Sequence, residues 1–166
     1  MKDLKFYLSE KYINYEDEKR FDDDIVKAID DYQGWSSTLN KSLFNKKLSK
    51  DEKEIVNKID DAFKKTSNKT NKDTLYRGIS NKRFNELVEK GELKYDAYLS
   101  TSLDKSIANR FNDKHENLLV ITPSKSYPFI YLSPDDKFRD EKEVLLPRGL
   151  KLKVDKVVDN IIYATV

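Results

Sequence analysis

The sequence predicts an α+β fold in which N-terminal helices pack on a mainly antiparallel, two-sheet β core. Apolar residues recur at helical spacing through about the first 70 residues, whereas short strand-like runs separated by turn residues follow. A length of 166 residues suits one domain with a sizeable core. We therefore expect a single domain, 1–166, with a helical part at 1–70 and a strand-rich part at 71–166.

Two helices are expected before residue 45. Acidic residues at 22–24 precede an apolar pattern that runs to Tyr32, and acids in a first turn suit the helix dipole. Gly34 is expected to end this helix. The hydroxyl residues at 36–38 then offer caps for a second helix that runs to Phe44.

A third helix is expected after a capping box. Ser49 and Glu52 stand three residues apart, just before apolar residues at helical spacing over 54–63. The polar stretch 66–71 then predicts a loop that separates the helical part from the strands.

Short strands and two short helices are expected after the loop. Phe84 to Gly91 has helical spacing, and Asp104 is placed to cap a helix that follows it. The strand-like segments are 74–79, 97–102, 118–121, 128–132, 143–146, 150–158 and 161–166.

Composition narrows the classes of function. Charged residues of both signs make up 37% of the chain and the net charge is +2, which indicates a solvated surface and makes a nucleic-acid partner unlikely on charge alone. The chain has no cysteine, which excludes disulfides and thiol nucleophiles, and its single histidine, His115, is interpreted as a loop residue. No apolar run reaches the roughly 20 residues of a membrane span, and the N-terminus lacks a signal-peptide core. We expect action without a membrane, in the cytoplasm of a host or target cell.

A pair of carboxylates stands directly before an apolar run. In an extended strand, residues i and i+2 project to the same face, so Glu141 and Glu143 are expected side by side, with Lys142 turned away. Two like charges at the lip of a core repel each other, which a purely structural sequence would avoid. The pair therefore indicates chemistry on a cationic or electron-poor substrate.

Two further strand segments offer polar groups. Arg77 precedes Gly78, and an arginine fork beside a glycine suits an anionic ligand such as phosphate. Ser100 and Ser102 alternate with Thr101, so two hydroxyls share one face of a strand.

Together these segments resemble the Arg, Ser-Thr-Ser and Glu-x-Glu signature of mono-ADP-ribosyltransferases. The resemblance is to the branch that holds bacterial binary-toxin enzymes, effectors and small phage enzymes, and it covers most of the chain. It rests on residues 76–78, 98–102 and 141–149, with aromatic residues at Phe111 and Phe138.

The resemblance implies that NAD is the co-substrate, without a metal. ADP-ribose would be passed to an acceptor with release of nicotinamide, through an oxocarbenium-like centre as in glycoside hydrolysis. It implies that Glu143 stabilises this cation, that Ser100 orients Glu143, and that Thr101 and Ser102 support the site. Arg77 would bind the phosphates of NAD.

The resemblance assigns further cofactor contacts. Gly78 would offer backbone groups to the nicotinamide amide, and Phe111 would line the nicotinamide. Lys114 would give a second phosphate contact, with Arg110 as the alternative. On the helical side, Tyr32 and Trp35 are interpreted first as helix packing. The alternative that the resemblance implies is an adenine-side wall formed together with Asn40.

The resemblance also assigns Glu141 a role in binding the acceptor. Family members with Glu at this position generally modify arginine, since a second carboxylate can dock a guanidinium and help take its proton. The resemblance therefore implies a target protein with an acceptor arginine. Phe138 and the acidic loop 133–137 would recognise a basic target.

Two other functions stay open. The first is an NAD glycohydrolase on the same fold, in which Glu141 has no evident role. The second is a non-catalytic binding module. We also expect that delivery into another cell, where it occurs, depends on a separate component.

Overall fold

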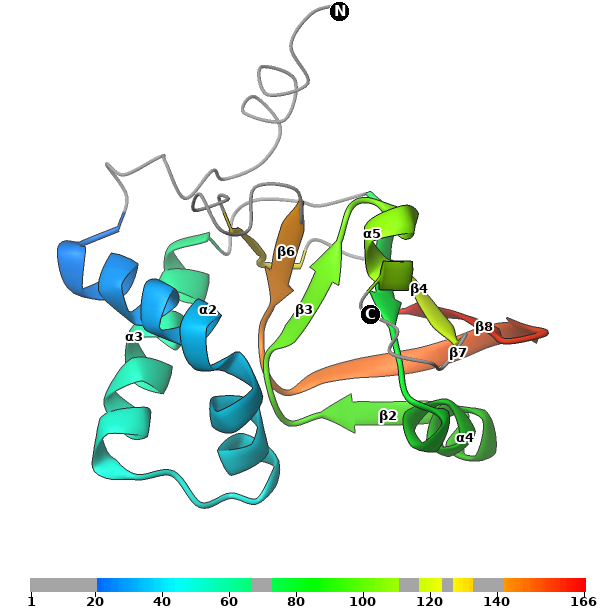
Figure 1. Ribbon diagram of the computed structural model, residues 1–166, viewed down its shortest axis with the longest axis horizontal. Helices are drawn as coiled ribbons and strands as arrows, with labels where there is room; N and C mark the ends of the chain where they lie inside the picture. The colour runs from blue at the N-terminus through cyan, green and yellow to red at the C-terminus, as the bar shows by residue number, and fades with distance from the viewer. Residues whose placement is uncertain (1–20, 67–72, 111–116, 124–126, 133–141) are drawn as a thin grey trace, which may run out of the picture.

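A helical layer stands beside a large, mostly antiparallel sheet in the computed structural model (Figure 1). The structure describes residues 21–66, 73–110, 117–123, 127–132 and 142–166. Its helices are α2 (Asp23–Phe44), α3 (Lys50–Thr66), α4 (Asn81–Lys90) and α5 (Lys105–Arg110). Its strands are β1 (Leu75–Gly78), β2 (Glu92–Tyr95), β3 (Leu99–Ser102), β4 (Leu118–Thr122), β5 (Ile130–Tyr131), β6 (Glu143–Leu146), β7 (Leu150–Val158) and β8 (Ile161–Thr165). The predicted α+β class is confirmed.

The two helices expected before residue 45 are both present, and the backbone leaves helical geometry between them directly after Gly34. Helix α2 continues to Phe44 across a kink at Trp35, whose φ of −129° and ψ of 19° are not helical. One residue bends the helix axis here without stopping the hydrogen-bonded turns on either side.

The capping box before α3 is confirmed. The Ser49 backbone N–H donates to Glu52 Oε2 at 2.7 Å, and the Glu52 N–H donates to Ser49 Oγ at 3.1 Å. The Ser42 hydroxyl also donates to Glu52 Oε1 at 2.6 Å, which ties the end of α2 to the start of α3. These hydrogen bonds hold the pKa of Glu52 below its usual range, with that from Ser42 as the largest cause.

In the described residues the strands pair in the order β2-β7-β8-β4-β1-β3-β6-β5, with β4 and β8 parallel and the other pairs antiparallel. The pairing of β1 with β3 is short, because Tyr76 opposite Ser102 is its one register pair. Strands β3 and β6 run across β2 and β7 in Figure 1. The two predicted sheets are thus two halves of one hydrogen-bonded sheet, joined at this point.

Strand β2 was not predicted from the sequence. It has four residues, Glu-Leu-Lys-Tyr, of which Leu93 and Tyr95 turn inward and Tyr95 is the buried one. Two apolar positions are too few to show a strand period, and β2 forms because it pairs with β7 at the edge of the sheet.

The main core extends from the helical layer across both halves of the sheet. Its largest fully buried side chains include Tyr32, Ile59, Tyr98 and Phe129. Among the described residues, no helix is both long and apolar enough to cross a membrane.

Candidate active site

Strand register brings the predicted polar residues of β3 and β6 together. Ser102 lies directly opposite Glu143, and Ser100 is opposite Leu145, two residues further along β6. Ser100, Ser102 and Glu143 therefore share one face of the sheet. The Ser100 hydroxyl donates a short hydrogen bond to Glu143 Oε1.

The backbone of Glu143 is held on both sides. Its residue pair with Ser102 belongs to the β3–β6 ladder, and its carbonyl accepts from the Leu132 N–H at 3.0 Å on the β5 side. Next to it, the buried Thr101 hydroxyl donates to the Val144 carbonyl at 2.6 Å. The carboxylate is thus placed by a continuous part of the sheet and oriented by Ser100.

Arg77 meets these residues from β1. It pairs with Leu119 of β4, and its guanidinium Nη1 donates a short hydrogen bond to the Ser100 carbonyl. Arg77 is half-buried, as are Gly78 and Ser100. The cation therefore stands at the edge of the same cavity as the Glu143 carboxylate.

The cavity has a volume of about 420 Å³, which lies in the range of small-molecule sites. Its strand side holds the predicted residues. Its helical side comes from α2, which the motifs did not point to apart from the aromatic residues and Asn40. The lining residues are Tyr32, Gln33, Ser36, Ser37, Asn40, Tyr76, Arg77, Gly78, Ser100, Thr101, Ser102, Ala108 and Glu143.

Asn40 lines the cavity and carries a buried acceptor. Its Nδ2 donates to the Tyr32 hydroxyl at 3.1 Å, whereas its Oδ1 is buried without a hydrogen-bond partner in the described part of the chain. Burial raises the pKa of Tyr32, so its hydroxyl stays protonated. An orphaned carbonyl oxygen in a cavity wall is where a ligand N–H or O–H would be bound.

A second cavity has a volume of about 290 Å³, and Arg77 also lines it. Arg83 of α4 lines it and lies over the rings of Phe44 and Tyr95, at 5.4 and 5.5 Å from their centroids. Arg77 and Gly78 line both cavities.

The backbone before β6 is not extended. Lys142 has a φ of 43°, in the left-handed region that non-glycine residues seldom adopt. The side-by-side placement of Glu141 and Glu143 assumed an extended Lys142, and that assumption is wrong. Lys142 Nζ instead pairs with Asp104 Oδ2 at 2.7 Å, and its carbonyl accepts from the Leu103 N–H at 3.1 Å.

Several predicted site residues lie outside the described residues: Phe111, Lys114, Phe138 and Glu141, together with His115 and the loop 133–137. Their placement and roles stay predictions. Arg110 is described and ends α5 with an exposed side chain.

The two aromatic residues Tyr32 and Trp35 of α2 differ in their exposure. Tyr32 is 1% exposed, which confirms helix packing for this residue, and it also lines the cavity. Trp35 is 70% exposed, so the packing interpretation is wrong for it. Within the described ranges, no group of three His, Asp or Glu side chains is placed to hold a metal ion.

A helical layer on a bent antiparallel sheet, with Arg, Ser and Glu meeting on three adjacent strands, defines the ADP-ribosyltransferase class. The chain belongs to the ADP-ribosyltransferase exoenzyme family, whose model matches residues 8–164. The resemblance stated from the motifs is therefore confirmed. A search of curated proteins gives no match.

Solved structures show the same fold. Exoenzyme S from Pseudomonas aeruginosa, bound to carba-NAD and human 14-3-3 protein beta, has a TM-score of 0.73 and 22% identity, over 94% of this chain and 78% of that one. Plx2a, a toxin from Paenibacillus larvae, has a TM-score of 0.74 and 22% identity, over 98% and 94% of the two chains.

The toxin BECa from C. perfringens, solved with NADH, has a TM-score of 0.71 and 18% identity. The match covers 98% of this chain and 48% of BECa, so this chain corresponds to about half of that protein. Two of these structures are bound to carba-NAD or NADH, which agrees with the NAD co-substrate that the resemblance implied.

Proposed function

We propose that this protein transfers ADP-ribose from NAD to an arginine side chain of a target protein and releases nicotinamide. The observation that carries the proposal is the Glu143 carboxylate, held by the Ser100 hydroxyl in a cavity that also exposes Arg77. A fixed acid beside a fixed cation suits a substrate whose ribose becomes positive while its diphosphate stays negative.

Glu143 supports cleavage of the bond between the ribose C1′ and the nicotinamide nitrogen. The bonding electrons leave with nicotinamide, and the ribose carbon acquires positive charge that the carboxylate stabilises. Ser100 keeps the carboxylate in one orientation. Ser102 and Thr101 secure the β3–β6 ladder on which both residues stand.

Arg77 and Gly78 bind the other parts of NAD. The planar guanidinium matches phosphate oxygens by paired N–H donors. Gly78 ends β1 at the cavity and has no side chain between its backbone and the ligand. The predicted contacts of Phe111 and Lys114 would complete the nicotinamide and phosphate subsites.

The helical wall binds the adenosine end. Asn40 Oδ1 is a buried acceptor without a partner in the described residues, and the adenosine part of NAD carries N–H and O–H donors. A hydrogen bond from the ligand would satisfy this oxygen. The exposed Trp35 next to the cavity-lining Ser36 supports the adenine-side interpretation of this face.

The arginine acceptor rests on Glu141. A guanidinium stays protonated at neutral pH and is a poor nucleophile, so a second carboxylate is needed to dock it and take its proton. Phe138 and the acidic loop 133–137 would attract a basic target surface. We propose that the chain acts as one catalytic domain inside a target or host cell. BECa, a component of a binary enterotoxin, supports delivery by a separate partner as one route.

The test begins with the purified protein and NAD. We expect nicotinamide release that Glu143→Ala reduces by about 10²- to 10³-fold, with unchanged thermal unfolding. Labelling of bacterial and eukaryotic lysates with a tagged NAD should mark a protein, and mass mapping should place the adduct on arginine. An adduct on another side chain would overturn the acceptor assignment.

Glu141→Gln separates the transferase from the NAD glycohydrolase. For a transferase, this change should abolish protein labelling while NAD hydrolysis continues. If wild-type protein hydrolyses NAD and labels nothing in either lysate, the glycohydrolase is the better description. If no nicotinamide is released at all, the chain is a binding module.

A further inference from the structure

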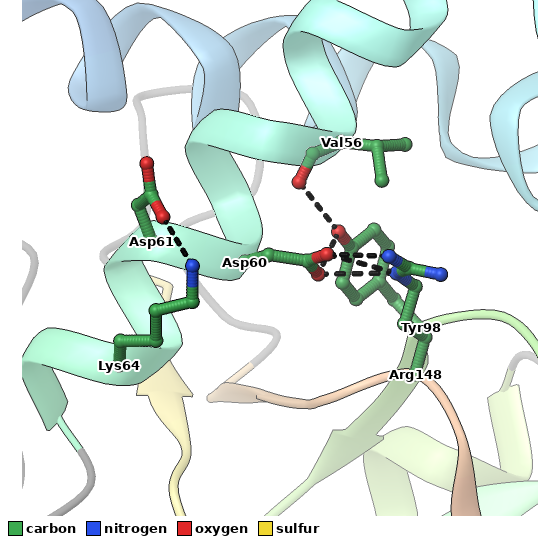
Figure 2. A network of polar contacts seen from close by, with 6 residues as sticks. All are labelled: Val56, Asp60, Asp61, Lys64, Tyr98 and Arg148. Atoms are coloured by element: carbon green, nitrogen blue, oxygen red, sulfur yellow. Dashed lines mark hydrogen bonds and ion pairs between the residues drawn. The ribbon is translucent and has the colours of Figure 1, made fainter.

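Two motif residues reach across the molecule to one carboxylate on α3. Tyr98 stands two residues before Ser100, and Arg148 follows β6 in the turn to β7. Both contact Asp60 of α3 (Figure 2). The chemistry proposed above uses neither of them.

Arg148 binds Asp60 with a two-pronged contact. Its Nη2 donates to Asp60 Oδ2 at 2.6 Å, and its Nε lies 3.1 and 3.0 Å from Oδ1 and Oδ2. This fork geometry is more directional than a single-point ion pair. The Asp60 side chain is 25% exposed and that of Arg148 is 42% exposed, so the pair lies at the solvent-facing edge of the contact between α3 and the β6–β7 turn. The hydrogen bonds from Arg148 to Asp60 raise the pKa of the guanidinium further.

Tyr98 reaches the same carboxylate from inside the core. Its side chain is fully buried, and its hydroxyl lies 2.7 Å from Asp60 Oδ1 and 3.0 Å from the Val56 carbonyl, both acceptors on α3. Burial raises the pKa of Tyr98, so the hydroxyl keeps the proton that it donates. A buried phenol without these acceptors would lose its hydrogen bond in a dry site.

The Tyr98 ring continues this link toward the cavity. It meets the Tyr32 ring edge-on at 5.6 Å and stacks on Phe63 at 5.9 Å. Tyr32 in turn accepts from Asn40 and lines the cavity. Asp60 is therefore connected to the helical wall through Tyr98 and Tyr32.

We infer that Asp60 is a positioning residue that sets the helical wall of the cleft against the two strands that carry Ser100 and Glu143. Apolar packing alone is non-directional and lets a helix slide on a sheet, whereas the directed bonds to Tyr98 and Arg148 fix α3 at one offset. This inference rests on the proposed function, because it concerns the fit of NAD.

The inference predicts a change in affinity with little change in turnover. Loss of the Asp60 contacts would displace the α2 wall. This wall carries Asn40, which is proposed to bind the ligand. The Ser100–Glu143 contact lies within the sheet and would persist. For Asp60→Asn we expect the KM for NAD to rise about 5- to 20-fold while kcat stays within about threefold.

The control variant lies one residue away. Asp61→Asn removes an exposed carboxylate of the same helix, whose pair with Lys64 at 2.7 Å is also drawn in Figure 2. It should leave both kcat and KM unchanged. Arg148→Lys keeps the positive charge but loses the fork, and it should raise KM by a smaller factor than Asp60→Asn.

The assay measures initial rates of nicotinamide release against NAD concentration at 20 °C or below, and NAD binding by calorimetry. Asp60→Asn and Arg148→Lys are compared only after thermal unfolding shows them folded at that temperature. If Asp60→Asn does not fold, Arg148→Lys decides, because that surface change removes no buried group. An unchanged KM and Kd in the folded variants, or an equal rise in Asp61→Asn, would overturn the inference. If wild-type protein binds NAD but releases no nicotinamide, the proposed function fails. The role of Asp60 in NAD binding is then decided by the Kd values alone.

Discussion

The strand side of the cavity is held mainly by backbone pairing, whereas its helical side is held by side chains. Glu143 sits in a ladder with β3 on one side and β5 on the other. The α2 wall has no such ladder to the sheet. Its position depends on packing and on contacts such as those of Asp60 with Arg148 and Tyr98.

This difference assigns different tasks to the two sides. A ladder holds a catalytic carboxylate to within the small tolerance that chemistry requires, because every neighbouring residue pair resists its displacement. A wall held by side chains can adjust to a bound dinucleotide. Changes on the strand side should therefore act on turnover, and changes on the helical side on affinity.

Among the changes that test this difference between the two sides, Ser100→Ala should have the largest effect. This change leaves the β3 backbone in place but frees the Glu143 carboxylate to rotate, so we expect kcat to fall about 10- to 100-fold with KM within about threefold. Steady-state nicotinamide release measures both. Ser49→Ala is the matched serine control, because it removes the cap of α3 at a cost of about 1 kcal/mol in stability and Ser49 lines neither cavity. A rise in KM at constant kcat for Ser100→Ala would contradict the division between the two sides.

A smaller effect is expected from the helical wall. The double variant Tyr32→Phe with Asn40→Leu replaces both hydrogen-bond partners by apolar groups of similar shape, so stability should stay within about 1 kcal/mol or improve. The lost acceptor should raise the KM for NAD about tenfold, with kcat nearly unchanged. Calorimetric NAD binding and thermal unfolding check the two parts. A fall in kcat with an unchanged Kd would place Asn40 in the chemical step instead.

The strand half of the site could be predicted because β geometry converts sequence spacing into direction. Ser100 and Ser102 share a face by alternation alone, and the strand boundaries 143–146 and 150–158 agree with the structure. Which strand lies beside which is a long-range property. The meeting of Arg77 with Glu143 came from the family resemblance, and spacing alone could not give it.

The helical half resisted prediction for local reasons. The break in α2 after Gly34 agrees with the sequence, but the 70% exposed side chain of Trp35 does not pack as its size and apolar character suggest. In the sequence, the positioning residue Asp60 cannot be told apart from the other acidic residues of its helix. Its partner Arg148 is 88 positions away, so no periodic pattern links them. The left-handed backbone of Lys142 could not be predicted either, because this position holds neither glycine nor asparagine.

The smallest effect is expected from a side-chain ion pair on the strand side. Asp104 pairs with Lys142, the residue before Glu143, and accepts hydrogen bonds from the Ser106 backbone and hydroxyl at 2.9 and 2.7 Å. The hydrogen bond from Lys142 is the largest cause that holds the pKa of Asp104 well below its usual range. A carboxyl with a lowered folded-state pKa stabilises the protein above its unfolded pKa of about 4, and this stabilisation is lost as pH falls below that value.

Asp104→Asn keeps an oxygen for the α5 cap but removes the charge. We expect it to lower the free energy of unfolding by about 1 kcal/mol at pH 7, with the gap from wild type narrowing as pH falls from 4 toward 2. Denaturant unfolding across this range measures the gap, and Glu89→Gln on the exposed face of α4 gives the control for loss of one acid. Because the ladder and not this ion pair positions Glu143, kcat at pH 7 should stay within about twofold. A tenfold loss of kcat in folded Asp104→Asn would show that the strand side, too, depends on side chains to hold its carboxylate.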